Sequence, residues 1–139
     1  MLLAIDAGNT NIVFALYDGT AMRAQWRAVT QVSRTADEYA VWLNQLLALN
    51  GLSFADLDAA IIATVVPVVL FDLRALCRTY LKCEPMIVGD PALDLGAKPE
   101  VDQPESIGAD RLCNTVAAHE RYKGAAVVVD FGTATNFDI

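Results

Sequence analysis

Two stretches of the chain combine an aspartate, a glycine and small polar residues in the same order. The first is Asp6-Ala7-Gly8-Asn9-Thr10-Asn11, and the second, near the other end of the chain, is Asp130-Phe131-Gly132-Thr133-Ala134-Thr135. Each follows an apolar run that predicts a buried strand. Glycine lets backbone N–H groups approach a phosphate, and hydroxyl and amide side chains add hydrogen-bond donors. The two stretches are candidates for phosphate-binding loops that face one nucleotide.

The two aspartates need a further partner in such a site. A carboxylate beside phosphates is repulsive unless a cation or a positioned water lies between them, so Asp6 and Asp130 are candidate cation ligands. The alternative is that each Asp-x-Gly is an ordinary turn at the end of a strand, where both residue types are common. The repetition favours ligand binding. The chain has neither the lysine of a P-loop nor a GxGxxG motif.

A third motif, Gly108-Ala109-Asp110-Arg111, stands at the start of a predicted helix. The helix N-terminus stabilises Asp110 as a carboxylate, which suits a group that accepts a proton from a hydroxyl nucleophile. Adjacent helical residues point about 100° apart, so Asp110 and Arg111 can address two different groups of one ligand. Arg111 can hold a ligand carboxylate through its fork of donors. Ordinary helix capping is the alternative interpretation.

The elements that must position these motifs alternate between strands and helices. Apolar runs and β-branched residues predict strands over 2–5, 12–17, 21–28, 59–66, 86–88 and 125–129. Helical spacing predicts helices over 35–50, 68–80 and 110–122. Residues 90–103, which are rich in proline, are expected to form an extended loop. This order predicts an α/β domain.

Composition narrows the function classes. The chain of 139 residues has a formal net charge of −7 and 55% hydrophobic residues, which favours a folded core and disfavours nucleic acid as a partner. The longest apolar stretch, residues 59–71, is interrupted and shorter than the roughly 20 residues of a membrane span. The N-terminus lacks the positive region of a secretion signal. We expect a cytoplasmic protein without a membrane anchor.

Together with Thr64-Val65-Val66-Pro67, these three motifs resemble those of the type III pantothenate kinases, in the acetate and sugar kinase/Hsc70/actin superfamily. The resemblance covers nearly the whole chain. It implies a ribonuclease H-like domain of the actin/Hsc70/sugar kinase type, with a mixed sheet flanked by helices, over residues 1–123. It also implies that residues 124–139 are the first strands of a second, similar domain, which is truncated here.

The resemblance implies ATP-dependent phosphorylation of pantothenate to 4'-phosphopantothenate, the first step of coenzyme A biosynthesis, by a homodimer. Asp110 would be the general base. The ATP contacts would be Asp6, Ala7, Gly8, Asn9, Thr10, Asn11 and Thr133. The pantothenate contacts would be Val101, Gly108, Ala109, Asp110 and Arg111. Asp130 would ligate a monovalent cation, potassium or ammonium, and Asp6 would ligate the magnesium that accompanies the nucleotide.

The chain departs from this family in two respects. Val101 stands where the family usually has a tyrosine that lines the pantothenate pocket. Family members are also about twice as long, so we expect this chain by itself to bind ATP poorly and not to turn over. Two other functions stay open: a non-catalytic relative that acts as an accessory transcription factor or binding module, and a kinase or phosphatase of the same superfamily with a sugar or acyl acid as substrate.

Overall fold

The computed structural model describes residues 1–97, 99–131 and 135–139, except for the side chain of residue 105. These residues form two compact units, Met1–Ile87 and Val88–Ile139. The sequence predicts a different boundary, between residues 123 and 124, which would separate two similar domains of a longer fold. The division into compact units does not test that boundary, which stays a prediction. Among the described residues, no helix is long and apolar enough to cross a bilayer.

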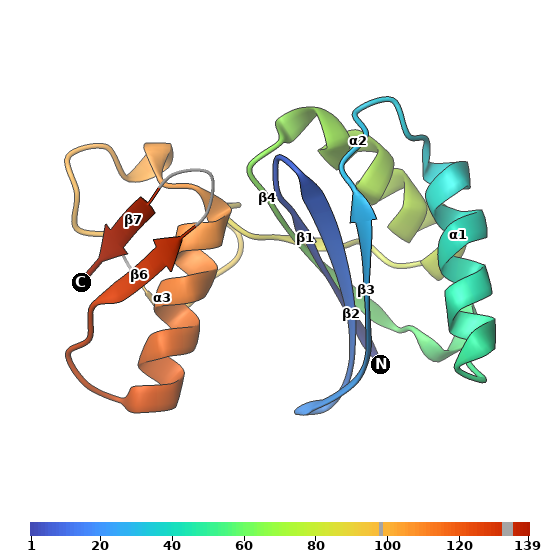
Figure 1. Cartoon of the computed structure of the whole chain (residues 1–139), viewed down its shortest axis with the longest axis horizontal. Helices are drawn as coiled ribbons and strands as arrows, with labels where there is room; N and C mark the ends of the chain where they lie inside the picture. The colour runs from blue at the N-terminus through green and yellow to red at the C-terminus, as the bar shows by residue number, and fades with distance from the viewer. Residues whose placement is uncertain (98, 132–134) are drawn as a thin grey trace. The chain divides into compact units, whose positions relative to one another are not determined.

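Figure 1 shows the elements in chain order. The first unit contains β1 (Leu2–Ala7), β2 (Asn11–Asp18), β3 (Ala21–Val29), α1 (Ala36–Leu49), the 3-10 helix η1 (Phe54–Asp56), β4 (Ala59–Thr64), α2 (Pro67–Leu76), the π-helical turn η2 (Cys77–Leu81) and β5 (Met86–Ile87). The second unit contains the 3-10 helix η3 (Pro104–Ser106), α3 (Ala109–Tyr122), β6 (Val128–Phe131) and β7 (Thr135–Asp138).

The first unit is built on a five-stranded mixed sheet with the strand order β3-β2-β1-β4-β5. Short turns make β1, β2 and β3 an antiparallel meander, whereas the crossover through α1 makes β4 parallel to β1. β5 extends the sheet by a further parallel strand. The predicted mixed sheet flanked by helices, of the sugar kinase and actin type, is therefore confirmed.

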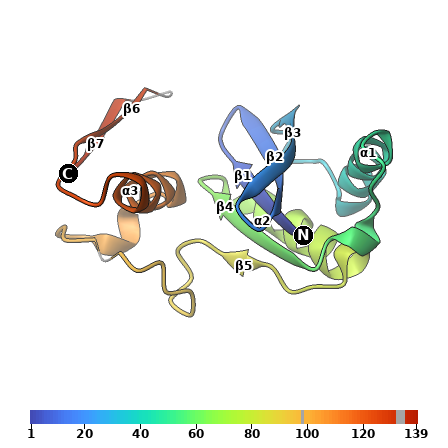
Figure 2. The same ribbon diagram turned by 90° about the horizontal axis from the view of Figure 1, so that it is seen from below.

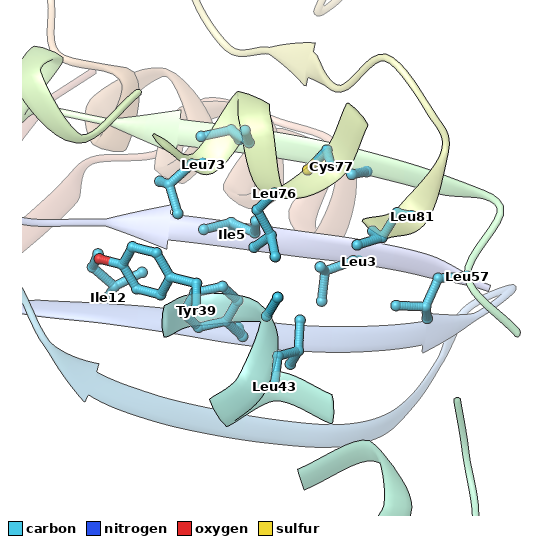
Figure 3. Packing of buried hydrophobic residues seen from close by; sticks show 14 of the residues in the cluster. Leu3, Ile5, Ile12, Tyr39, Leu43, Leu57, Leu73, Leu76, Cys77 and Leu81 are labelled. Carbon is cyan, nitrogen blue, oxygen red and sulfur yellow. The ribbon is translucent and has the colours of Figure 1, made fainter. Parts of the chain in front are cut away.

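The core of the first unit lies between this sheet and its two long helices. Leu3 and Ile5 of β1 are buried, while Asp6 of the same strand is exposed, because successive side chains point to opposite faces. Tyr39 of α1 and Leu73 of α2 join the same cluster. Figure 3 shows these side chains pointing toward one another between strands and helices. One face of β1 therefore anchors the core, and the other carries the first candidate site residue.

Local signals set the helix boundaries. Thr35 accepts a hydrogen bond from the backbone N–H of Glu38, whose carboxylate accepts one from the N–H of Thr35, so α1 begins in a capping box. This helix ends at Leu49 with Asn50 as its C-cap, next to the predicted end at Asn50-Gly51, and Gly51 has a φ of +70°. The strand predicted over 59–66 ends earlier, at Thr64, because Pro67 occupies the first turn of α2.

The second unit corrects one predicted element. The strand expected over 125–129 is β6, Val128–Phe131. Its ladder with β7 begins where Val128 pairs with Asp138, so 125–127 have no strand partner among the described residues. Asp130 consequently lies within the strand, one residue before its end, as Asp6 does in β1. Figure 2 shows the segment after β5, whose described residues, 88–97 and 99–103, form no helix or strand.

Candidate active site

The turn between β1 and β2 is fixed by backbone hydrogen bonds. The N–H of Gly8 donates to the carbonyl of Asn11 at 3.0 Å. Thr30, just beyond β3, holds the turn from the side: its hydroxyl donates to the carbonyl of Gly8 at 2.7 Å, and its N–H donates to the carbonyl of Thr10 at 2.9 Å. The side chains of Asn9 and Thr10 stay exposed. The result is a rigid turn that presents polar groups to an approaching ligand.

Gly8 is not required by the turn itself. Its φ is not in the left-handed range that favours glycine. A Cβ atom built on Gly8 would meet the carbonyl oxygen of Asn11 at 3.4 Å, an ordinary contact. The described chain therefore leaves space for a methyl group beside the Gly8 backbone, in contact with the Asn11 carbonyl oxygen. A phosphate oxygen fits such a space, so the turn suits the predicted nucleotide contact.

Thr64 ties the neighbouring strand to the same edge of the sheet. In the register of β1 and β4, Ala7 lies opposite Thr64 and Asp6 lies opposite Ala63. The hydroxyl of Thr64 donates to the carbonyl of Ala7 at 3.1 Å and accepts from the N–H of Val66 at 2.9 Å. The motif at residues 64–67 thus supports the end of β1 and the start of α2, and so supports the turn that follows Asp6.

The third motif lies at the N-terminus of α3. Gly108 is the N-cap and Asp110 is in the first turn, as the sequence predicts. One oxygen of the half-buried Asp110 carboxylate accepts a hydrogen bond from the N–H of Arg111 at 2.8 Å. This bond fixes the orientation of the carboxylate at the start of the helix. A carboxylate oriented in this way can accept a proton from a hydroxyl group that is placed beside it.

The guanidinium of Arg111 pairs with Asp138 of β7. Its Nε donates to Asp138 Oδ1 at 2.9 Å, and its Nη2 donates to the same oxygen. Nη2 also lies 3.5 Å from the carbonyl oxygen of Phe137. The hydrogen bond to Asp138 raises the pKa of Arg111, which keeps the guanidinium charged. Sequence reasoning did not identify Asp138, because nothing local marks a strand residue as the partner of an arginine on α3.

A cavity of about 380 Å³ in the second unit is lined by both Arg111 and Val101. The other lining residues are Ala97, Pro99, Glu100, Ile107, Leu112, Thr115, Phe137, Asp138 and Ile139. The cavity thus brings together two of the predicted pantothenate contacts, on a wall that combines apolar side chains with the Arg111–Asp138 ion pair and Glu100. Gly108, Ala109 and Asp110 do not line it. Their predicted contacts with substrate stay predictions.

Asp130 is half-buried on β6, and the side-chain amide of Asn114 donates to its Oδ2 at 3.4 Å. The part of the chain that the structure describes contains no cluster of three His, Cys, Asp or Glu residues suited to a metal ion. The cation roles of Asp130 and Asp6 stay predictions. Thr133, the other predicted ATP contact, lies outside the described residues.

The strand order and the glycine turn after β1 define a mixed α/β domain of the sugar kinase and actin type. The model of the type III pantothenate kinase family matches residues 2–139, so the chain belongs to this family.

Curated relatives agree with this assignment. A protein of Paramagnetospirillum magneticum (strain ATCC 700264 / AMB-1) named type III pantothenate kinase is 61% identical over 139 residues, which are 100% of this chain and 54% of that protein. One of Rhodospirillum rubrum, with the same name, is 59% identical over the same shares. One of Zymomonas mobilis, also so named, is 54% identical over 99% of this chain and 50% of its own length. The chain thus spans about half the length of the curated relatives it matches.

Proposed function

We propose that the protein transfers the γ-phosphate of ATP to the primary hydroxyl of pantothenate and so forms 4'-phosphopantothenate, the first step of coenzyme A biosynthesis. The observation that carries this proposal is the family match, which runs along residues 2–139 and includes all three motifs. A non-catalytic role is not proposed, because each relative quoted above is named as the kinase.

The turn after β1 is proposed to bind the phosphates of ATP. Its geometry supports this role, because Gly8 carries no side chain beside its backbone while Thr30 holds the turn in place. Phosphoryl transfer depends on positioning and on stabilising charge, so a rigid turn with exposed donors is well suited to it. The residues assigned to ATP are Asp6, Ala7, Gly8, Asn9, Thr10, Asn11 and Thr133.

Asp110 is proposed as the general base. Its carboxylate accepts the proton of the pantothenate hydroxyl as the hydroxyl oxygen bonds to the γ-phosphorus, and the bond from that phosphorus to the bridging oxygen of ADP breaks. The hydrogen bond from the N–H of Arg111 fixes the orientation of this carboxylate. Arg111 binds the carboxylate of pantothenate, and Val101 contributes to the apolar wall of the cavity that Arg111 lines. Gly108 and Ala109 complete the substrate contacts.

The proposal includes the ions and the assembly. Asp130 would hold a monovalent cation, potassium or ammonium, and Asp6 would hold magnesium with the nucleotide. Cations there would offset the repulsion between carboxylates and phosphates. The protein would act in the cytoplasm as a homodimer.

A panel of phosphate acceptors tests this function. The uninterrupted gene product is incubated with ATP, magnesium and potassium, and with pantothenate, a hexose or acetate, while ADP release is followed and products are identified by mass spectrometry. We expect ADP release with pantothenate and a product heavier by one phosphoryl group. Preferential turnover of the hexose or acetate would show that the protein has another kinase activity of the superfamily. A folded protein that is inactive with every acceptor would contradict the proposal.

A further inference from the structure

The ion pair between Arg111 and Asp138 uses only one side of each partner. Nε and Nη2 of Arg111 both donate to Asp138 Oδ1. The described part of the chain gives Nη1 no hydrogen-bond partner. The side chain of Arg111 is 33% exposed, whereas that of Asp138 is 13% exposed. One edge of the guanidinium is therefore held inside the unit, and the other edge is available to a ligand.

Stability alone is a poor explanation for this pair. Asp138 Oδ2 is buried and has no hydrogen-bond partner among the described residues. A buried carboxylate oxygen without a partner is costly, and a partly buried ion pair gains little net stability after desolvation. An apolar contact between α3 and β7 would hold the two elements together without the desolvation cost of a partly buried ion pair. The pair therefore calls for an explanation in terms of what it does to Arg111.

We propose that Asp138 is a positioning residue, which holds the guanidinium of Arg111 at the wall of the cavity with Nη1 directed to a ligand carboxylate. An arginine has many rotamers, and fixing one of them before binding lowers the entropy that binding must lose. Asp138 fixes the Nε and Nη2 edge, and Phe137 adds a backbone acceptor to it. This inference rests on the proposed function and names the group that prepares the substrate-binding arginine.

The test compares steady-state constants of the uninterrupted gene product and its variants. Asp138→Asn keeps the size of the side chain but removes its charge. We expect the KM for pantothenate to rise about tenfold or more, with kcat and the KM for ATP changed less than about twofold. Asp138→Glu, which restores the charge, should recover much of the loss. Glu120→Gln is the matched control, because it breaks an exposed ion pair with Lys123 on the same helix and should change no constant.

A double-mutant cycle separates positioning from a structural role. If Asp138 acts through Arg111, Asp138→Asn should have no further effect on the KM for pantothenate in an Arg111→Ala background. Additive effects, or equal changes in all constants, would overturn the inference. If Asp138→Asn fails to fold, Asp138→Glu takes its place in the cycle, and a rise in its KM for pantothenate that persists at the same size in an Arg111→Ala background would overturn the inference. A wild type that does not phosphorylate pantothenate would instead refute the proposed function, and this inference with it.

Discussion

The substitution Gly8→Ala separates the needs of the fold from the needs of the ligand. The φ of Gly8 is one that alanine adopts without strain, and the new Cβ would lie 3.4 Å from the nearest atom, the carbonyl oxygen of Asn11. Replacing glycine at such a position stabilises proteins by about 0.4–1 kcal/mol through the unfolded state. We therefore expect the free energy of unfolding to stay the same or to rise by up to about 1 kcal/mol.

The same methyl group should impair ATP binding. It would project from the turn at the point where the proposal places a phosphate oxygen. We expect the KM for ATP to rise at least about tenfold, equivalent to about 1.4 kcal/mol of lost binding, with the KM for pantothenate little changed. Urea unfolding followed by circular dichroism gives the first quantity, and a coupled assay for ADP gives the second.

Gly51→Ala is the matched control, because it should lower stability and leave ATP binding unchanged. Gly51 follows α1 with a φ of +70°, where an L-residue is strained by about 1–2 kcal/mol, and nothing lies within 4 Å of its added Cβ. This variant should lose stability and keep its KM for ATP. The reasoning is refuted if Gly8→Ala keeps wild-type ATP affinity, or if it loses as much stability as Gly51→Ala.

Three further predictions concern the fold. Leu73→Ala should cost about 2–5 kcal/mol of unfolding free energy in urea titrations, because Leu73 is fully buried between α2 and the sheet, whereas Leu49→Ala at an 81% exposed site should cost less than about 0.5 kcal/mol. Thr35→Ala should cost about 1 kcal/mol, because it removes the side-chain half of the capping box. The hydrogen bonds from the Thr35 backbone and side chain lower the pKa of Glu38 in the folded protein. Their contribution to stability should therefore be present above the unfolded pKa of Glu38 and lost as the pH falls through the lower folded pKa. Equal acid sensitivity of the wild type and Thr35→Ala would contradict this. Burial raises the pKa of Cys77 from 9.0 to about 12, so above pH 9 the thiol ionises only when the protein unfolds, and stability should fall by about 1.4 kcal/mol per pH unit up to pH 12. In Cys77→Ala the free energy of unfolding should fall less steeply with pH over this range. An identical pH dependence in both proteins would show that folding does not raise the pKa of the Cys77 thiol.

Patterns that are local in the sequence predicted most of the first unit. The apolar run over residues 2–5 predicts β1, and the helical spacing over 35–50 predicts α1. The glycine turn after Asp6 was predicted because glycine and small polar residues mark it within a few positions. The strand near Asp130 was displaced by three residues at its start, because its register depends on pairing with β7 rather than on its own apolar run.

The contacts that shape the candidate site were harder to predict, because they join residues far apart in the chain. Thr30 reaches the carbonyl of Gly8 only because β3 pairs with β2. Asp138 reaches Arg111 only because β7 packs near α3. A hydroxyl or a carboxylate at a strand end is common, so residue type alone gives no signal for either contact. The motifs predict the candidate site, and the tertiary structure adds the residues that contact it, Thr30 and Asp138.

The measurement that tests the central claim most directly is phosphate transfer from ATP to pantothenate by the uninterrupted gene product, compared with its Asp110→Asn variant. Asparagine keeps an oxygen for the hydrogen bond from the N–H of Arg111 but cannot accept the proton. We predict that kcat falls by about 10²–10⁴-fold while ATP affinity and the folded circular dichroism spectrum are retained. Wild-type turnover by Asp110→Asn, or no 4'-phosphopantothenate from the folded wild type, would contradict the account.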